Sequence, residues 1–204
     1  NIESKIAQYL TNRKAGIGGD GVIIFSKINQ KTIKIYVINK DGTYPEMCIN
    51  GLFSATAFTK NIYGFVDGLI YYNKMPFTYL YHKESGLFKM EFPLPSLDPK
   101  KFINTKKNTF LNQKIKSPFG ILSLYFVSVG NPHTIMFCDN AETMNIEPLG
   151  KAIENDKIFI NKTNVEFVTV KNDTTLYARF WERGVERQKA VALELLLYHT
   201  LHPT

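Results

Sequence analysis

The stretch Asn39-Lys-Asp-Gly-Thr-Tyr-Pro-Glu-Met-Cys48-Ile-Asn50-Gly51 joins two apolar segments. The run before it, Ile33 to Ile38, alternates like a strand, and Asp41-Gly42 is typical of a turn. The small apolar residues from Leu52 to Phe58 predict a buried helix. Cys48 is therefore expected at a strand-to-helix junction, where the helix dipole and unpaired N–H groups lower the pKa of a thiol. Such a thiolate can take a proton from carbon or attack an electrophile; a buried structural cysteine is the alternative.

Length and composition predict a soluble globular protein. The chain has 204 residues, of which 44% are hydrophobic and 21% charged, enough for one large domain or two of about 100 residues. No apolar run approaches the roughly 18 residues of a membrane span, and no secretory signal opens the chain. We expect no membrane partner. Two cysteines are too few for a disulfide framework, which indicates a reducing, cytoplasmic location.

The net charge of +7 does not by itself indicate nucleic acid. The basic residues gather in Lys100-Lys101, Lys106-Lys107 and Lys114 to Lys116, with little aromatic interleaving. That pattern is typical of a solvated connector, and we expect no nucleic-acid partner.

The sequence of the first half predicts a short helix, followed by strands before and after the Cys48 helix. The glycine-rich Gly16-Ile-Gly18-Gly19-Asp20-Gly21 precedes a strand, whereas a dinucleotide loop must follow one. A backbone turn or a close approach to a ligand explains it better. The helix is expected at Glu3 to Leu10, and the strands at Val22 to Phe25, Ile33 to Ile38, Leu69 to Tyr72, Phe77 to His82 and Leu87 to Phe92.

The second half repeats this theme after a Pro- and Lys-rich passage, Pro93 to Pro118, which predicts a domain connector. A strand-to-turn junction at Glu182-Arg183-Gly184-Val185 precedes a helix-like Lys189 to Leu197. We expect two similar domains, residues 1–110 and 111–204, facing a shared cleft. Strands are expected at Phe119 to Val129, Thr134 to Cys138, Val165 to Val170 and Leu176 to Trp181.

Four segments together carry a family resemblance. They are Arg13…Gly16-Ile-Gly18-Gly19-Asp20-Gly21, Asn39-Lys-Asp-Gly-Thr…Met47-Cys48-Ile-Asn50-Gly51, Val127-Ser-Val-Gly130-Asn131-Pro132-His133 and Glu182-Arg183-Gly184-Val185. In order and spacing the chain resembles the cofactor-independent diaminopimelate epimerases across most of its length. Each segment alone is a weak signal, and four in register make a strong one.

The resemblance implies an α/β (α+β) fold of two topologically similar mixed-sheet domains with central helices, related by a pseudo-twofold axis. Each domain would present one catalytic cysteine to an amino acid. The implied reaction interconverts LL- and meso-diaminopimelate for lysine and peptidoglycan synthesis, without pyridoxal phosphate, another cofactor or a metal. The implied assembly is a cytoplasmic homodimer.

The match also implies roles for individual residues. Cys48 would be one of two acid/base thiols, His133 would tune the reacting centre, and Glu182 would orient the thiol or bind the substrate's distal end. Read singly, Asn131 before Pro132 fits a turn, and Glu182–Arg183 fits a surface ion pair. The residues expected to bind substrate are Asn39, Ile49, Asn50, Asn131, Asn164, Glu182 and Arg183.

The sequence departs from the family at its second cysteine. The family pattern after Glu-Arg-Gly-Val is Gly-Glu-Thr-x-Ala-Cys-Gly-Thr/Ser-Gly-Ala, and here Val191 stands where the thiol belongs. Written as codons and read from one base earlier, Glu186 to Leu195 permits Gly-Glu-Thr-Lys-Ser/Gly-Cys-Gly-Ser/Thr-Gly-Ala. We hypothesise that one nucleotide was lost after Val185. Cys138 lies at a non-matching position and is expected in the core.

Two further departures lie beside Cys48. Ile49 replaces a glycine and could crowd a carboxylate pocket, and Phe53 replaces the usual arginine. With one thiol missing, we expect this chain to be inactive or severely impaired in epimerisation. The alternatives are an isomerase with a carboxylate base, Glu46 or Glu182, and a retired enzyme kept as a ligand-binding or interaction module.

Overall fold

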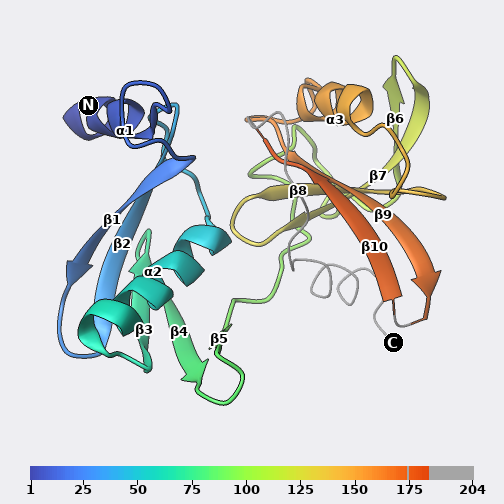
Figure 1. Cartoon of the computed structure of the whole chain (residues 1–204). Coiled ribbons are helices and arrows are strands. Elements are labelled where there is room, and N and C mark those ends of the chain that lie inside the picture. The colour runs from blue at the N-terminus through green and yellow to red at the C-terminus, as the bar shows by residue number, and fades with distance from the viewer. Residues whose placement is uncertain (174, 184–204) are drawn as a thin grey trace. The chain divides into compact units, whose positions relative to one another are not determined.

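The structure, a computed structural model, describes residues 1–173 and 175–183. The chain forms two compact units, the first Asn1–Pro93 and the second beginning at Leu94 (Figure 1). Within the described residues, each unit contains one five-stranded sheet. Each sheet has one parallel pair and is otherwise antiparallel, so the predicted α+β class with two mixed sheets is confirmed. No helix in this part of the chain is long and apolar enough to cross a membrane.

The first unit folds around the predicted Cys48 helix. Its sheet order is β1-β2-β3-β4-β5, and only the β2–β3 pair is parallel. The parallel pair requires a crossover, which α2 supplies. Leu52 and Ala55 of α2 share one apolar core with Ile35, Ile70 and Phe77 of the sheet. The elements are α1 (Ile2–Thr11), β1 (Gly21–Lys27), β2 (Thr32–Asn39), α2 (Ile49–Tyr63), β3 (Asp67–Tyr72), β4 (Met75–His82) and β5 (Leu87–Met90).

The glycine-rich segment after α1 closes that helix. The amides of Ile17 and Gly18 both donate to the Leu10 carbonyl, at 2.9 Å each. A Cβ on Gly16 would lie 2.1 Å from the Tyr9 carbonyl oxygen, so no larger residue fits there. The segment therefore satisfies carbonyl groups that the last turn of α1 leaves open. The backbone-turn interpretation is confirmed.

The second unit uses the same hairpin–helix–hairpin order, with β7, β8, α3, β9 and β10 in place of β1, β2, α2, β3 and β4. Its sheet order is β10-β9-β8-β7-β6, and the β8–β9 pair is parallel. The helix α3 provides the crossover and was not predicted from the sequence. The elements are β6 (Gln113–Ser117), β7 (Gly120–Ser128), β8 (Pro132–Phe137), α3 (Glu147–Glu154), β9 (Asn164–Asn172) and β10 (Thr175–Trp181).

The second unit begins earlier than the predicted boundary between residues 110 and 111. Ile103 and Phe110, from the passage predicted as a connector, are buried in the core of this unit. The amide of Phe126 donates to the Phe110 carbonyl at 2.8 Å, which ties the passage to β7. Isolated apolar residues among lysines have no periodicity, so the sequence pattern did not reveal these contacts.

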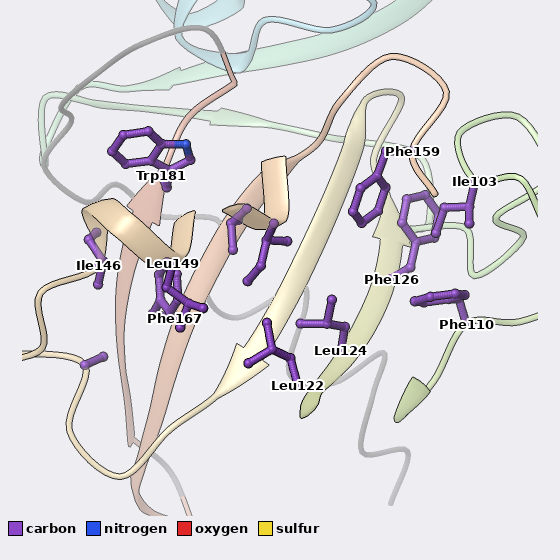
Figure 2. Close-up of a cluster of buried hydrophobic side chains, with 13 residues drawn as sticks. Ile103, Phe110, Leu122, Leu124, Phe126, Ile146, Leu149, Phe159, Phe167 and Trp181 are labelled. Carbon is purple, nitrogen blue, oxygen red and sulfur yellow. The ribbon is translucent and has the colours of Figure 1, made fainter. Parts of the chain in front are cut away.

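Trp181 closes this core at the end of β10. Figure 2 shows it on the same side as α3, above the cluster that includes Leu149 and Phe167. A Cβ on Gly150 would lie 2.6 Å from the indole ring, so α3 approaches the ring closely only because residue 150 is glycine. The indole Nε1 donates to Glu154 Oε2 at 2.8 Å. These contacts hold the strand end from which Glu182 and Arg183 follow.

Candidate active site

Cys48 is the residue that caps the start of α2. Its backbone is extended, with φ −142° and ψ 92°, and its Sγ accepts a hydrogen bond from the Gly51 amide at 3.3 Å. Amides in the first turn have no partner within the helix. The hydrogen bond and the positive end of the helix dipole both favour the thiolate over the thiol. The predicted strand-to-helix junction is confirmed, and the side chain is half-buried.

Gly51 makes this capping geometry possible. A Cβ at that position would lie 3.0 Å from Val37 Cγ2 and 3.1 Å from the Cys48 sulfur. Ordinary carbon contacts are about 3.5–4.0 Å. A glycine here therefore allows α2 to approach β2 and leaves the sulfur beside the helix amide.

The loop that leads into Cys48 is held from the turn between β3 and β4. The Tyr72 hydroxyl donates to the Pro45 carbonyl at 2.8 Å, and Asn73 Nδ2 lies 3.3 Å from the carbonyls of Pro45 and Glu46. Burial raises the pKa of Tyr72, and negative charge at Cys48 and Glu46 raises it further. The phenol therefore stays protonated and remains a hydrogen-bond donor to the loop.

The other predicted residues of the first unit lie around the same junction. Asn39 ends β2, and its Nδ2 donates to Thr43 Oγ1 at 3.0 Å. Asn50 is exposed in the first turn of α2. Ile49 packs against the core of the unit, so the core takes up part of the side chain that could crowd a carboxylate pocket. Phe53, which stands in place of an arginine, packs near the Phe92 ring with centroids 6.3 Å apart.

In the second unit, strand register brings the remaining predicted residues to one end of the sheet. His133 at the start of β8 lies opposite Asn164 at the start of β9. Because β10 runs antiparallel to β9, its last residue, Trp181, lies opposite Val165. The residues that precede β8 and follow β10 therefore emerge at the same sheet end.

Asn164 connects these strands through its carboxamide. Its Nδ2 donates to the Pro132 carbonyl at 2.9 Å, and its Oδ1 accepts from the Arg183 amide at 3.0 Å. The Arg183 guanidinium donates through Nη1 to the Asn161 carbonyl at 3.0 Å. Asn164 thus braces the backbone on both sides of this sheet end, in addition to any role toward a ligand.

A buried glutamate that the sequence analysis missed lies beside His133. Glu166 Oε1 is 2.6 Å from His133 Nδ1, and His133 Nε2 is 3.1 Å from Asn131 Oδ1. Asn131 sits in the short turn between β7 and β8 and is half-buried, so the turn position and the histidine contact coexist. A carboxylate between Val165 and Phe167 in an otherwise apolar strand was the available signal, since buried charges are paired.

The remaining predicted residues fall into three groups. Glu182 is half-buried after β10. Cys138 packs against the second unit's core, as expected, and burial raises the pKa of its thiol. Val191 and the predicted helix Lys189 to Leu197 lie outside the described residues. In the part of the chain that the structure describes, no three His, Cys, Asp or Glu side chains are grouped so as to hold a metal ion.

Several solved structures have a fold similar to that of this chain. A probable proline racemase from Agrobacterium radiobacter K84 superimposes with TM-score 0.57 at 12% identity, over 86% of this chain and 57% of that one. A phenazine biosynthesis protein of the PhzF family from Enterococcus faecalis gives TM-score 0.52 at 15% identity, over 88% and 61%. At these identities the likeness concerns the fold alone.

Comparison of sequences identifies the family, which the similarity of fold does not. The family model for diaminopimelate epimerase matches residues 125–190. The curated diaminopimelate epimerase of Desulforapulum autotrophicum is 34% identical over 195 residues, which cover 88% of this chain and 66% of the relative. That of Caldanaerobacter subterraneus is 31% identical over 193 residues, or 89% and 69%. The chain thus spans about two thirds of the length of these relatives, and it belongs to the diaminopimelate epimerase family.

Proposed function

We propose that this chain carries the α-proton chemistry of a diaminopimelate epimerase at Cys48, interconverting LL- and meso-diaminopimelate for lysine and peptidoglycan precursor synthesis. The observation that carries the proposal is the half-buried sulfur at the start of α2, hydrogen-bonded to the Gly51 amide. The names of the curated relatives support the substrate.

The start of α2 offers both parts of this chemistry. The α-proton of an amino acid is very weakly acidic, so its base must be close, aligned and partly desolvated. Cys48 supplies a thiolate whose ionised form the helix start stabilises. Charge that builds on the substrate carboxylate needs preorganised donors. The first-turn amides of Ile49 and Asn50 supply them in our proposal.

The second unit supplies hydrogen-bonding groups in the proposal. Asn131, together with Asn39 and Asn164, would bind the polar groups of the amino acid. Glu182 and Arg183 would bind its distal end, and His133 would tune the reacting centre. His133, Asn164 and Arg183 meet at one end of the second sheet, which supports a common role for them.

The chain contains two cysteines, Cys48 and Cys138, and neither stands at the family's second position. Inversion of a stereocentre is simplest with one group on each face, one removing a proton while the other donates one. A valine side chain at position 191 can do neither. The family-model match ends at residue 190, next to this departure. We therefore propose that epimerisation is severely impaired in this chain.

The test compares two forms of the chain. One is expressed from the unchanged coding sequence. The other is expressed from a coding sequence with one base added after the codon of Val185, which restores the cysteine motif. Chiral chromatography measures conversion of LL- to meso-diaminopimelate. Loss of one acid/base group costs about a hundred- to ten-thousand-fold in rate, so we expect the restored chain to be faster by that factor. Cys48→Ala should abolish its activity, whereas Cys138→Ala should not. Equal rates of conversion for the unchanged and restored chains would refute the proposed impairment.

A retired enzyme that still binds the amino acid is the second candidate, and the valine at position 191 favours it. Calorimetry with diaminopimelate would then show binding that Asn131→Ala weakens, with no turnover. An isomerase with a carboxylate base, Glu46 or Glu182, would instead keep its activity in Cys48→Ala. These outcomes separate the three functions.

The proposal extends to a cytoplasmic homodimer that works without pyridoxal phosphate. Light scattering during gel filtration measures the assembly, and a monomer at micromolar concentration would contradict it. Activity of the restored chain that disappears on treatment with a carbonyl-trapping reagent would contradict independence from pyridoxal phosphate.

A further inference from the structure

Glu166 is a buried carboxylate that takes no part in the proposed chemistry. It is 1% exposed, and His133, its partner, is 7% exposed. Glu166 Oε1 lies 2.6 Å from His133 Nδ1, while Oε2 has no hydrogen-bond partner among the described residues. A carboxylate buried with a single contact is costly, since buried charges need partners. Any role of Glu166 must therefore act through its contact with His133.

The hydrogen-bonding chemistry of the three side chains fixes where a proton lies. Asn131 Oδ1 is 3.1 Å from His133 Nε2. An amide oxygen only accepts hydrogen bonds, so Nε2 must carry a proton and donate it. Another proton lies between Nδ1 and the Glu166 carboxyl. Whichever of those two atoms holds that proton, the histidine–glutamate pair is neutral overall and Nε2 remains a donor.

The donor at Nε2 in turn determines how the Asn131 carboxamide is oriented. Because Asn131 Oδ1 faces the His133 ring, Nδ2 and its two N–H donors point away from that ring. With an apolar residue in place of Glu166, the His133 ring would be a neutral imidazole that can carry its one proton on either nitrogen. A bare Nε2 would favour the reversed amide, with Nδ2 toward the ring and Oδ1 away from it.

We infer that Glu166 is a positioning residue that orients the Asn131 carboxamide through His133, so that Asn131 presents N–H donors. This assignment rests on the proposed function: the group that these donors meet is a carboxylate of diaminopimelate other than the one that the amides of Ile49 and Asn50 bind. Reversal of the amide would set an oxygen against that anion. The arrangement thus favours an anionic ligand group at the end of the sheet where β8 and β9 begin.

Side-chain NMR of the full chain labelled with nitrogen-15 tests the positioning without any ligand. Spectra of Glu166→Leu and Glu166→Met are compared with the unchanged protein, and Asn131→Ala assigns the Asn131 amide pair. Thr169→Val is the matched control, because Thr169 is a buried polar residue of the same strand that bonds Cys138 and Ala141 instead. Circular dichroism confirms folding of each variant.

We expect the Asn131 amide pair to shift in Glu166→Leu, and the His133 Nε2–H resonance to disappear. Glu166→Met, which has a similar length and no hydrogen-bond donor for Nδ1, should also shift the Asn131 pair, and it decides the question if Glu166→Leu does not fold. Thr169→Val should leave both signals in place. Unchanged Asn131 signals in the folded Glu166 variants, or equal changes in Thr169→Val, would overturn the inference.

Calorimetry with diaminopimelate then separates the positioning from the substrate assignment. Loss of one well-placed hydrogen bond to a charged group weakens binding by about tenfold or more, and we expect that loss in Glu166→Leu. An unchanged protein that fails to bind diaminopimelate, while the Asn131 signals still depend on Glu166, would refute the substrate and leave the positioning intact. Binding that is equally tight in a variant with altered Asn131 signals would refute the role toward the carboxylate.

Discussion

Replacing Gly51 with alanine adds one methyl group where α2, β2 and the Cys48 sulfur meet. The new Cβ would lie 3.0 Å from Val37 Cγ2 and 3.1 Å from the sulfur. Val37 is buried on β2, an inner strand of the sheet, so the sulfur is the group that can move. Its rotation would break the 3.3 Å hydrogen bond from the residue 51 amide.

Two opposing effects set the change in stability. Overpacking a tight site costs about 1–3 kcal/mol, whereas alanine is better than glycine inside a helix by about 1 kcal/mol. We expect Gly51→Ala to lower the free energy of unfolding by about 0–2 kcal/mol. The loss of the amide donor should also slow alkylation of Cys48, because the thiolate is the nucleophile.

Urea denaturation measures the stability, and peptide mapping after timed iodoacetamide treatment gives the alkylation rate at Cys48. Ser54→Ala, an exposed change in the same helix, is the control and should leave that rate unchanged. The reasoning fails if Gly51→Ala gains the full helix-propensity benefit of about 1 kcal/mol and alkylates at the original rate.

Three smaller effects follow from the same structure. Tyr72→Phe removes the hydrogen bond to the Pro45 carbonyl, so we expect a loss of about 1 kcal/mol in urea denaturation; an unchanged midpoint would mean that the bond does not stabilise the loop. Burial opposes ionisation of Asp41, but hydrogen bonds from Thr43 lower its pKa overall. Its stabilising contribution is therefore present above the unfolded value of about 3.9 and lost as pH falls through the lower folded value. Asp41→Asn should be less stable than the unchanged protein at about pH 7, and the difference should shrink as the pH falls below the unfolded value; a constant difference would contradict this. Burial raises the pKa of Cys138, so its alkylation should rise only at higher pH than that of free cysteine, and a matching pH profile would contradict the burial.

The local chemistry around Cys48 could be predicted from the sequence because it depends on neighbours in the chain. Alternation in Ile33 to Ile38, the Asp41-Gly42 turn and the apolar start of α2 all act over a few residues. The strands β1 to β5 and β7 to β10 were predicted for the same reason, since each has its own period-two pattern. Gly51 was quoted only as part of a motif, because its contact with Val37 requires the packing of α2 on β2.

The features that the sequence did not reveal depend on contacts between distant segments. Glu166 reaches His133 because β8 and β9 are parallel neighbours in one register, and no local pattern specifies that pairing. The burial of Ile103 and Phe110 depends on the sheet that they cover. The need for glycine at position 150 of α3 arises only from its close contact with Trp181. In each case the determining partner lies many residues away.

The central claim is that the Cys48 sulfur removes the α-proton of an amino acid, and hydrogen exchange measures this step directly. The unchanged chain is incubated with diaminopimelate in heavy water, and proton NMR follows the α-hydrogen, with Cys48→Ala and Cys138→Ala in parallel. The account predicts exchange at one stereocentre, little formation of the other isomer, complete loss in Cys48→Ala and retention in Cys138→Ala. Undiminished exchange in Cys48→Ala, or none in the unchanged protein, would contradict it.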